Sequence, residues 1–170
     1  MHFAPGRVLI MSHKIYVAVY IASLVAANLL VACLGPWFSP INALVLIGLD
    51  LSLRDKLHDA WQGRWLALRI AGLIAGAGVI SYLLNPAAGM IAVASVTAFC
   101  AAMAADSIAY QLLYRFGWLT RANGSNVAGA IVDSIIFPTL AFGGFVPERV
   151  AMQFAAKVAG GAVWSFILRK

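Results

Sequence analysis

Charged residues are scarce in this chain. Only 11% of its 170 residues are Asp, Glu, Lys or Arg, whereas 63% are hydrophobic. Soluble domains carry roughly 25% charged residues, and a mean hydropathy of +0.91 would leave large apolar patches facing water. These values exclude a water-soluble globular domain, so we expect the chain to lie in a lipid bilayer.

Groups that catalyse reactions or bind metal ions are also few. The two cysteines, Cys33 and Cys100, have no histidine nearby and form no metal-binding pattern. The chain has no GxxxxGK(S/T) phosphate loop, which excludes ATP hydrolysis by that machinery. We therefore expect no enzyme activity, no cofactor and no metal site.

Two long runs contain no charged residue at all, residues 15–49 and 70–105. A helix needs about 20 residues to cross a bilayer, so each run is long enough for two spans. Each run also has a helix breaker near its middle, Gly35-Pro36 in the first and Asn85-Pro86 in the second. Each run is therefore predicted to form two transmembrane helices.

Two further apolar stretches follow, residues 126–145 and 150–168, and they bring the total to six spans. Membrane β-strands are not expected, because the runs lack an alternating ten-residue pattern and helices alone remain to satisfy the backbone in lipid. The sequence thus predicts an all-α integral membrane protein with a single domain over residues 1–170. The expected helices lie near 14–34, 41–61, 65–84, 88–116, 124–143 and 148–168.

Dividing the chain after the third helix gives two halves of three helices each. An odd number of spans places the halves in opposite orientations, as in transporters built from inverted repeats with a binding site at the membrane midplane. Sequence support for such a repeat consists of Asp50 and Asp133, each on the middle helix of its half.

The basic residues are distributed asymmetrically between the two sides of the predicted bundle. The loops around residues 35–40, 85–87 and 144–149 contain only Arg149, whereas ten basic residues belong to the other side. These ten are Arg7, Lys14, Arg54, Lys56, Arg64, Arg69, Arg115, Arg121, Arg169 and Lys170. Because short cytoplasmic loops retain Lys and Arg, we expect a multi-pass protein of the bacterial inner (plasma) membrane with both termini cytoplasmic. The net charge of +6 then reflects topology, and no nucleic-acid partner is expected.

Ionisable residues inside the predicted spans are the main indication of function, because a charge within the bilayer is costly and commonly marks a substrate or ion pathway. They are Asp50, Arg54, Asp106, Asp133 and Lys157. At about 1.5 Å of rise per residue, Asp50, Asp133 and Lys157 lie near the midplane. The alternative is that these charges only hold helices together, but Ser, Thr or Asn can do that at lower cost. A binding site is therefore favoured.

Neutral polar residues extend this set. Asn28 lies well inside the first helix, and Gln153 precedes Lys157 by one turn. For either amide alone, a hydrogen bond between helices is the expected role. On the fifth helix one face is formed by Asn126, Gly129, Asp133 and Phe137. Taken with the charges, these residues predict a polar cavity.

The residues in this arrangement resemble the VUT (vitamin uptake transporter) family of queuosine-precursor transporters, from about residue 15 to residue 168. The matching positions are Asp50-Leu51-Ser52-Leu53-Arg54, Asp106 before Tyr110 and Arg115, Gly129 with Asp133-Ser134 and Ala141-Phe142, and Lys157, while Ala27-Asn28 resembles a Ser-Asn pair of the family. The chain departs from the family in its very short loops and in Ala130, where some members have a polar amide.

The resemblance implies a six-helix importer of 7-deazaguanines, the precursors of queuosine in tRNA. A deazaguanine has two adjacent N–H donors that a carboxylate accepts together, a carbonyl acceptor and a flat ring. Asp50 and Asp133 are candidate acceptors, Lys157 and Asn28 candidate donors, and Phe137 a candidate for stacking. The full predicted binding set is Asn28, Asp50, Arg54, Asp106, Asn126, Asp133, Phe137 and Lys157. Import would be driven by protons or by trapping of the product.

A second hypothesis is the substrate-capturing subunit of an energy-coupling-factor importer, which depends on a separate ATPase. Ala18, Ala22 and Ala26 resemble the small-residue surface through which such subunits dock. Alanines at this spacing, like Gly72, Gly76 and Gly78, are more commonly a sign of close helix packing. A homodimer is a further arrangement that the sequence leaves open.

Overall fold

A computed structural model describes residues 13–61 and 65–168 of the chain. All secondary structure in this part is helical. Six of its helical segments are long and apolar enough to cross a membrane. The predicted all-α membrane fold with six spans is therefore confirmed.

The second span is built from three consecutive helical pieces, and each of the other spans is one helix. The elements are α1 (His13–Leu34), η1 (Pro36–Phe38), α2 (Ser39–Asn42), η2 (Ala43–Ile47), α3 (Gly48–Trp61), α4 (Leu66–Leu84), η3 (Pro86–Ala88), α5 (Gly89–Leu112), α6 (Trp118–Phe142) and α7 (Pro147–Leu168).

The predicted breakers end the helices as expected. Gly35 and Gly143 follow α1 and α6 with φ of 77° and 73°, a left-handed conformation that glycine adopts without the steric cost of a side chain. Asn85 follows α4 in an extended conformation, and its side chain accepts a hydrogen bond of 3.1 Å from the Ala87 amide. Proline then begins the short 3₁₀ turns η1 and η3.

The connection between the fourth and fifth spans is shorter than expected. Helix α5 ends at Leu112 rather than at residue 116, and α6 begins at Trp118 rather than at residue 124. The prediction was wrong at both ends: it carried the fourth helix through Arg115, which lies in the connection, and it placed Arg121, which lies in α6, in a loop. Charge marks the edge of the apolar layer, but a helix that has left the bilayer keeps its backbone hydrogen bonds and can continue.

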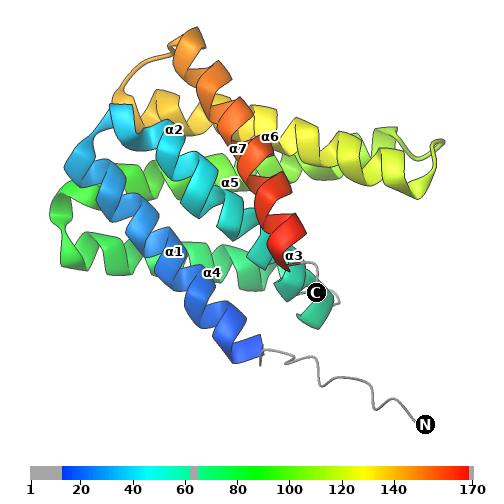
Figure 1. The fold of residues 1–170 in the computed structure, drawn as a ribbon, viewed down its shortest axis with the longest axis horizontal. Coiled ribbons are helices and arrows are strands. Elements are labelled where there is room, and N and C mark those ends of the chain that lie inside the picture. Colours follow the sequence, from blue (N-terminus) through cyan, green and yellow to red (C-terminus); the bar gives the residue numbers. More distant parts are fainter. Residues whose placement is uncertain (1–12, 62–64, 169–170) are drawn as a thin grey trace, which may run out of the picture.

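The connections are grouped at the two ends of the bundle. Figure 1 shows the α1–α2, α4–α5 and α6–α7 connections on the left, while the α5–α6 connection, the start of α1 and the end of α7 lie toward the right. We call these the η1/η3 end and the α5–α6 end. Among the described basic residues, Lys14 and Arg69 near the starts of α1 and α4 and Arg115 in the α5–α6 connection lie at the α5–α6 end, whereas Arg149 lies in the first turn of α7 at the other. Arg7, Arg64, Arg169 and Lys170 lie outside the described residues.

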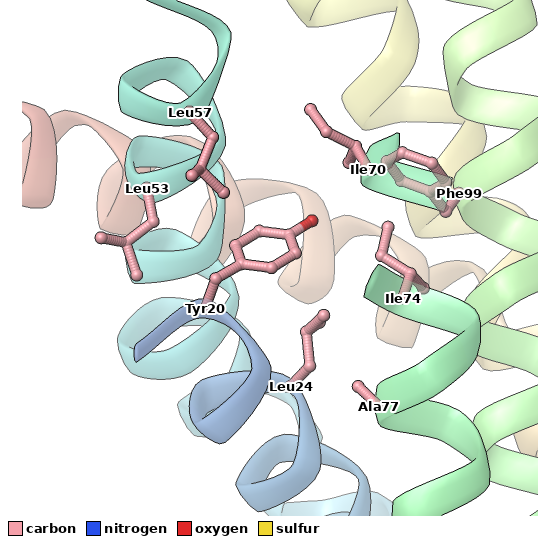
Figure 2. Packing of buried hydrophobic residues seen from close by; sticks show 8 residues of the cluster. All are labelled: Tyr20, Leu24, Leu53, Leu57, Ile70, Ile74, Ala77 and Phe99. Atoms are coloured by element: carbon pink, nitrogen blue, oxygen red, sulfur yellow. The ribbon is translucent and has the colours of Figure 1, made fainter. Parts of the chain in front are cut away.

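A cluster of buried apolar side chains joins α1, α3, α4 and α5. Figure 2 shows the Tyr20 ring of α1 between Leu24 and the two leucines of α3, Leu53 and Leu57. Tyr20 and Leu57 are fully buried. Because the outer surface of the bundle faces lipid, this cluster is needed to seal helices against one another rather than to remove apolar surface from water.

Helix α7 crosses the second span in backbone contact. An added Cβ at Gly48 would lie 2.6 Å from the Gly160 carbonyl carbon, and one at Gly160 would collide with the Leu44 carbonyl. The crossing coincides with the π-helical segment η2, where the Trp164 indole N–H donates a 2.8 Å hydrogen bond to the Val45 carbonyl. This contact places Lys157, one turn before Gly160, beside the second span.

The prediction of close packing holds at one of the three glycines of α4. An added Cβ at Gly78 would lie 3.4 Å from the Ala92 Cβ, whereas at Gly72 and Gly76 it would meet nothing within 4 Å. Ala18 and Ala22 of α1 are likewise exposed. The prediction was wrong for Gly72 and Gly76 because small apolar residues also fit a lipid-facing surface, where spacing alone does not distinguish the two environments.

Candidate functional site

One cavity of about 940 Å³ opens among the helices, and residues from all six spans line it. All eight residues predicted from the sequence are among them: Asn28, Asp50, Arg54, Asp106, Asn126, Asp133, Phe137 and Lys157. The predicted face of α6 is confirmed, since Asn126, Gly129, Asp133 and Phe137 all border this space. The fold therefore brings together residues that are up to 129 positions apart in the sequence.

Asp133 and Lys157 form an ion pair between α6 and α7. Lys157 Nζ lies 2.5 Å from Asp133 Oδ2, and the lysine is 3% exposed. The ammonium also lies 5.8 Å from the centroid of the Phe137 ring, at a distance typical of cation–π contacts. Because a buried charge without a partner is strongly destabilising, each member holds the other in the cavity wall.

Asp50 is buried, and its surroundings differ from those of the partly buried Asp133. Its residue is 7% exposed, and Oδ1 has no hydrogen-bond partner among the described residues. Arg54, one turn further along α3, has its guanidinium 5.8 Å from the centroid of the Phe99 ring. Within the part of the chain that the structure describes, Asp50 and Arg54 form no ion pair.

Asp106 and Asn126 border the cavity toward the α5–α6 end. Asp106 is half-buried, and Asn126 is exposed. Helices α5 and α6 approach closely here, since an added Cβ at Gly129 would lie 3.3 Å from the Ala102 carbonyl oxygen and 3.5 Å from Asp106 Cβ. The lining at this end therefore includes an exposed polar residue.

The η1/η3 end of the cavity is closed by buried polar side chains. Asn28 Nδ2 of α1 donates to Ser81 Oγ of α4 (3.2 Å), and Asn42 Nδ2 of α2 donates to the Ala27 carbonyl (3.3 Å). Gln153 of α7 donates to Ser39 Oγ of α2. We call these three hydrogen bonds the polar seal. They are the interhelical bonds expected for Asn28 and Gln153 taken singly, and they separate the cavity from the nearby connections.

Sequence reasoning missed part of this lining. Ser39, Asn42 and Ser125 border the cavity and are buried. Ser39 and Asn42 follow the Gly35-Pro36 breaker, at the start of the second span. A polar side chain costs less free energy there than at mid-span, and this position was the signal that could have identified them. The prediction rests on ionisable groups at mid-span, which are a stronger signal of a site than neutral polar groups near the end of a span.

A metal site is not indicated by the described residues, which contain no group of three or more His, Cys, Asp or Glu side chains that could hold an ion. The polar lining consists of carboxylates, amides, hydroxyls and two basic groups, and apolar side chains such as Ile47, Phe99 and Met103 complete the walls. Such a lining suits a compact organic molecule with several hydrogen-bonding groups and a flat apolar body.

Comparison with known proteins adds one match. The profile of a family described as "putative vitamin uptake transporter" matches residues 14–168. Neither a curated protein nor a solved structure gives a significant match. The matched range contains all six spans and every residue of the cavity.

Proposed function

We propose that this chain, which belongs to the vitamin uptake transporter family, imports queuosine precursors through the cavity between its six spans. The substrates would be 7-deazaguanines: 7-cyano-7-deazaguanine, its aminomethyl derivative or queuine. The observation that carries the proposal is the convergence of Asp50, Asp133, Lys157 and Arg54 on one cavity inside a bundle that spans the membrane. The family is one of transporters, which argues against a catalytic use of these charges.

The size and chemistry of the cavity support a small heterocycle. About 940 Å³ is within the range of small-molecule pockets, roughly 300–1,000 Å³. Buried carboxylates can accept ring N–H and amine donors, and Lys157 can donate to a carbonyl. A lipid would need no such groups, and a sugar would call for more amides that bind hydroxyls.

The closure of one end supports a transport cycle. The polar seal closes the η1/η3 end, while lining residues are exposed toward the α5–α6 end. With both termini cytoplasmic, as the basic residues predict, the α5–α6 end faces the cytoplasm of a bacterial cell and this state is the one that releases substrate. Loading from outside then requires the seal to break.

Complementation tests the proposal. A cell unable to make 7-deazaguanines should regain queuosine in its tRNA when it expresses this gene and receives an external precursor. The readout is the queuosine content of isolated tRNA, with an empty vector as the control. If no precursor restores the modification although the protein is present in the membrane, the substrate class is wrong.

The second candidate function is substrate capture for an energy-coupling-factor importer. The observation in its favour is the exposed position of Ala18 and Ala22 on α1, which leaves a small-residue face open to a partner. Uptake by a host that lacks the ATPase assembly separates the two functions. A solitary transporter works there, and a capture subunit binds substrate without importing it.

A further inference from the structure

The two acids near the middle of the cavity are not equivalent. Asp133 has its Oδ2 occupied by Lys157 at 2.5 Å. Asp50 is more than nine-tenths buried and lines the same cavity, yet its Oδ1 accepts no hydrogen bond from the described residues. A buried carboxylate oxygen without a donor is destabilising, because it has lost its hydrogen bonds to water. The fold retains this cost at Asp50 and not at Asp133.

The neighbours of Asp50 offset this cost only in part. The titratable and charged groups that act on it are Tyr20 on α1, Arg54 on α3 and Asp133 on α6. The Tyr20 hydroxyl is a donor that acts on the Asp50 carboxylate, but it makes no hydrogen bond of normal geometry, and Figure 2 shows it pointing away from α1. The Arg54 guanidinium lies over Phe99. Asp50 therefore borders the cavity without an ion-pair partner, and its Oδ1 has no hydrogen bond of normal geometry from the described residues.

From this asymmetry we propose a division of roles between the two acids, which rests on the function proposed above. Asp50 accepts the two adjacent N–H donors of the imported heterocycle, the ring N–H and the exocyclic amine. Lys157, positioned by Asp133, donates to the neighbouring carbonyl. A carboxylate binds two parallel N–H groups in bidentate fashion, and an ammonium with three donors can serve both Asp133 and a ligand. Asp50 is thereby the residue that determines specificity for the 2-amino-6-oxo edge.

This assignment predicts discrimination between two ligands that differ in one group. The pair is 7-cyano-7-deazaguanine and the analogue that lacks only the exocyclic amine. Removing the amine leaves one oxygen of Asp50 without a donor, and a site built to hold a polar group rejects such an analogue strongly. The purified full-length protein should therefore bind the amine-bearing ligand at least about 10-fold more tightly, as expected for a hydrogen bond to a charged group.

The experiment measures equilibrium binding of both ligands to the wild type, Asp50→Asn and Glu148→Gln. Asp50→Asn should weaken binding of the amine-bearing ligand by about 10- to 100-fold and change binding of the analogue little, so that discrimination collapses. Glu148→Gln removes one exposed acid of α7 outside the cavity and should keep the wild-type ratio.

The outcomes separate this assignment from the proposed function. Equal affinity of the wild type for both ligands overturns the role of Asp50, even if Asp50→Asn fails to fold. If Asp50→Asn weakens the binding of both ligands equally, the role of Asp50 is also overturned, because that result indicates a structural role. If the wild type binds neither ligand, the substrate class itself is wrong and the assignment falls with it.

Discussion

Lys157 Nζ lies 2.5 Å from Asp133 Oδ2, so that an ion pair joins α6 to α7 in the wall of the cavity. The two residues come from different helices of the second half of the chain, and the lysine is buried while the aspartate is 24% exposed at its side chain. Both members line the cavity, and the acid is the more exposed of the two. It is both a contact between helices and a candidate contact for substrate.

Replacing either member should abolish uptake. Asp133→Asn leaves the buried Lys157 charge without its partner, at a cost of about 3–5 kcal/mol, whereas Lys157→Met leaves the partly exposed Asp133 at a smaller cost. Each removes a group of the proposed site. The protein should still be inserted, since the spans remain apolar. Uptake of labelled precursor and the amount of protein in the membrane are the two measurements.

The double replacement is the control for this pair. It removes both charges and should recover folded protein without recovering uptake. Normal transport by both single variants would show that the site lies elsewhere. Recovery of transport by the double variant would show that the ion pair only holds the helices together and does not bind substrate.

Asp106 should matter most for a cationic precursor. It is half-buried and lines the cavity toward the α5–α6 end, away from the Asp133–Lys157 pair. Asp106→Asn should reduce uptake of the aminomethyl precursor more than uptake of the nitrile or the free base, because only the first carries a positive charge. Competition assays with the three precursors measure this, and equal losses would reject the role.

The crossing of α7 over the second span can be tested at two adjacent glycines. Gly160→Ala would drive its Cβ into the Leu44 backbone, whereas at Gly161 the nearest atom, Leu51 Cδ1, would be 3.7 Å away. Overpacking of this kind costs about 1–3 kcal/mol. Gly160→Ala should therefore lower the thermal stability of the purified protein, and Gly161→Ala should not. Similar melting of both variants would be inconsistent with the close contact.

The polar seal should control access to the cavity from the η1/η3 end. After both native cysteines are replaced, a cysteine at Ala43, which is 1% exposed, should react slowly with an impermeant maleimide added at that end. Gln153→Leu removes the bond to Ser39 and should speed labelling several-fold, because interhelical hydrogen bonds contribute about 0.6–2 kcal/mol. A cysteine at Asn126, at the other end, should label at an unchanged rate. An unaffected rate at residue 43 would show that this bond does not close the cavity.

Orientation in the membrane can be tested with fused reporters. A reporter active only in the cytoplasm should work near Arg115 and at both termini, and should be inactive near Phe38 or Val146. The reason is the excess of basic residues on the first set of segments. Activity after Phe38 would reverse the orientation, and with it the side to which the cavity opens.

The sequence alone was sufficient for the number of helices and for eight of the residues that line the cavity. Whether a segment spans a bilayer depends on its own composition and length, and breakers such as Gly35 and Asn85 act locally. Polar groups such as Asp50 and Asp133 avoid lipid, so those at mid-span turn toward a common interior. Local chemistry therefore placed all eight candidate residues on one cavity.

The tertiary structure decided which of these residues are paired. That Lys157 binds Asp133 and leaves Asp50 open depends on how α7 crosses the second span at Gly48 and Gly160. The seal between Gln153 and Ser39, and the open faces of Gly72 and Gly76, follow from the same packing. Each is set by the distance and rotation between helices far apart in the chain. Periodicity along one helix carries no information about either quantity.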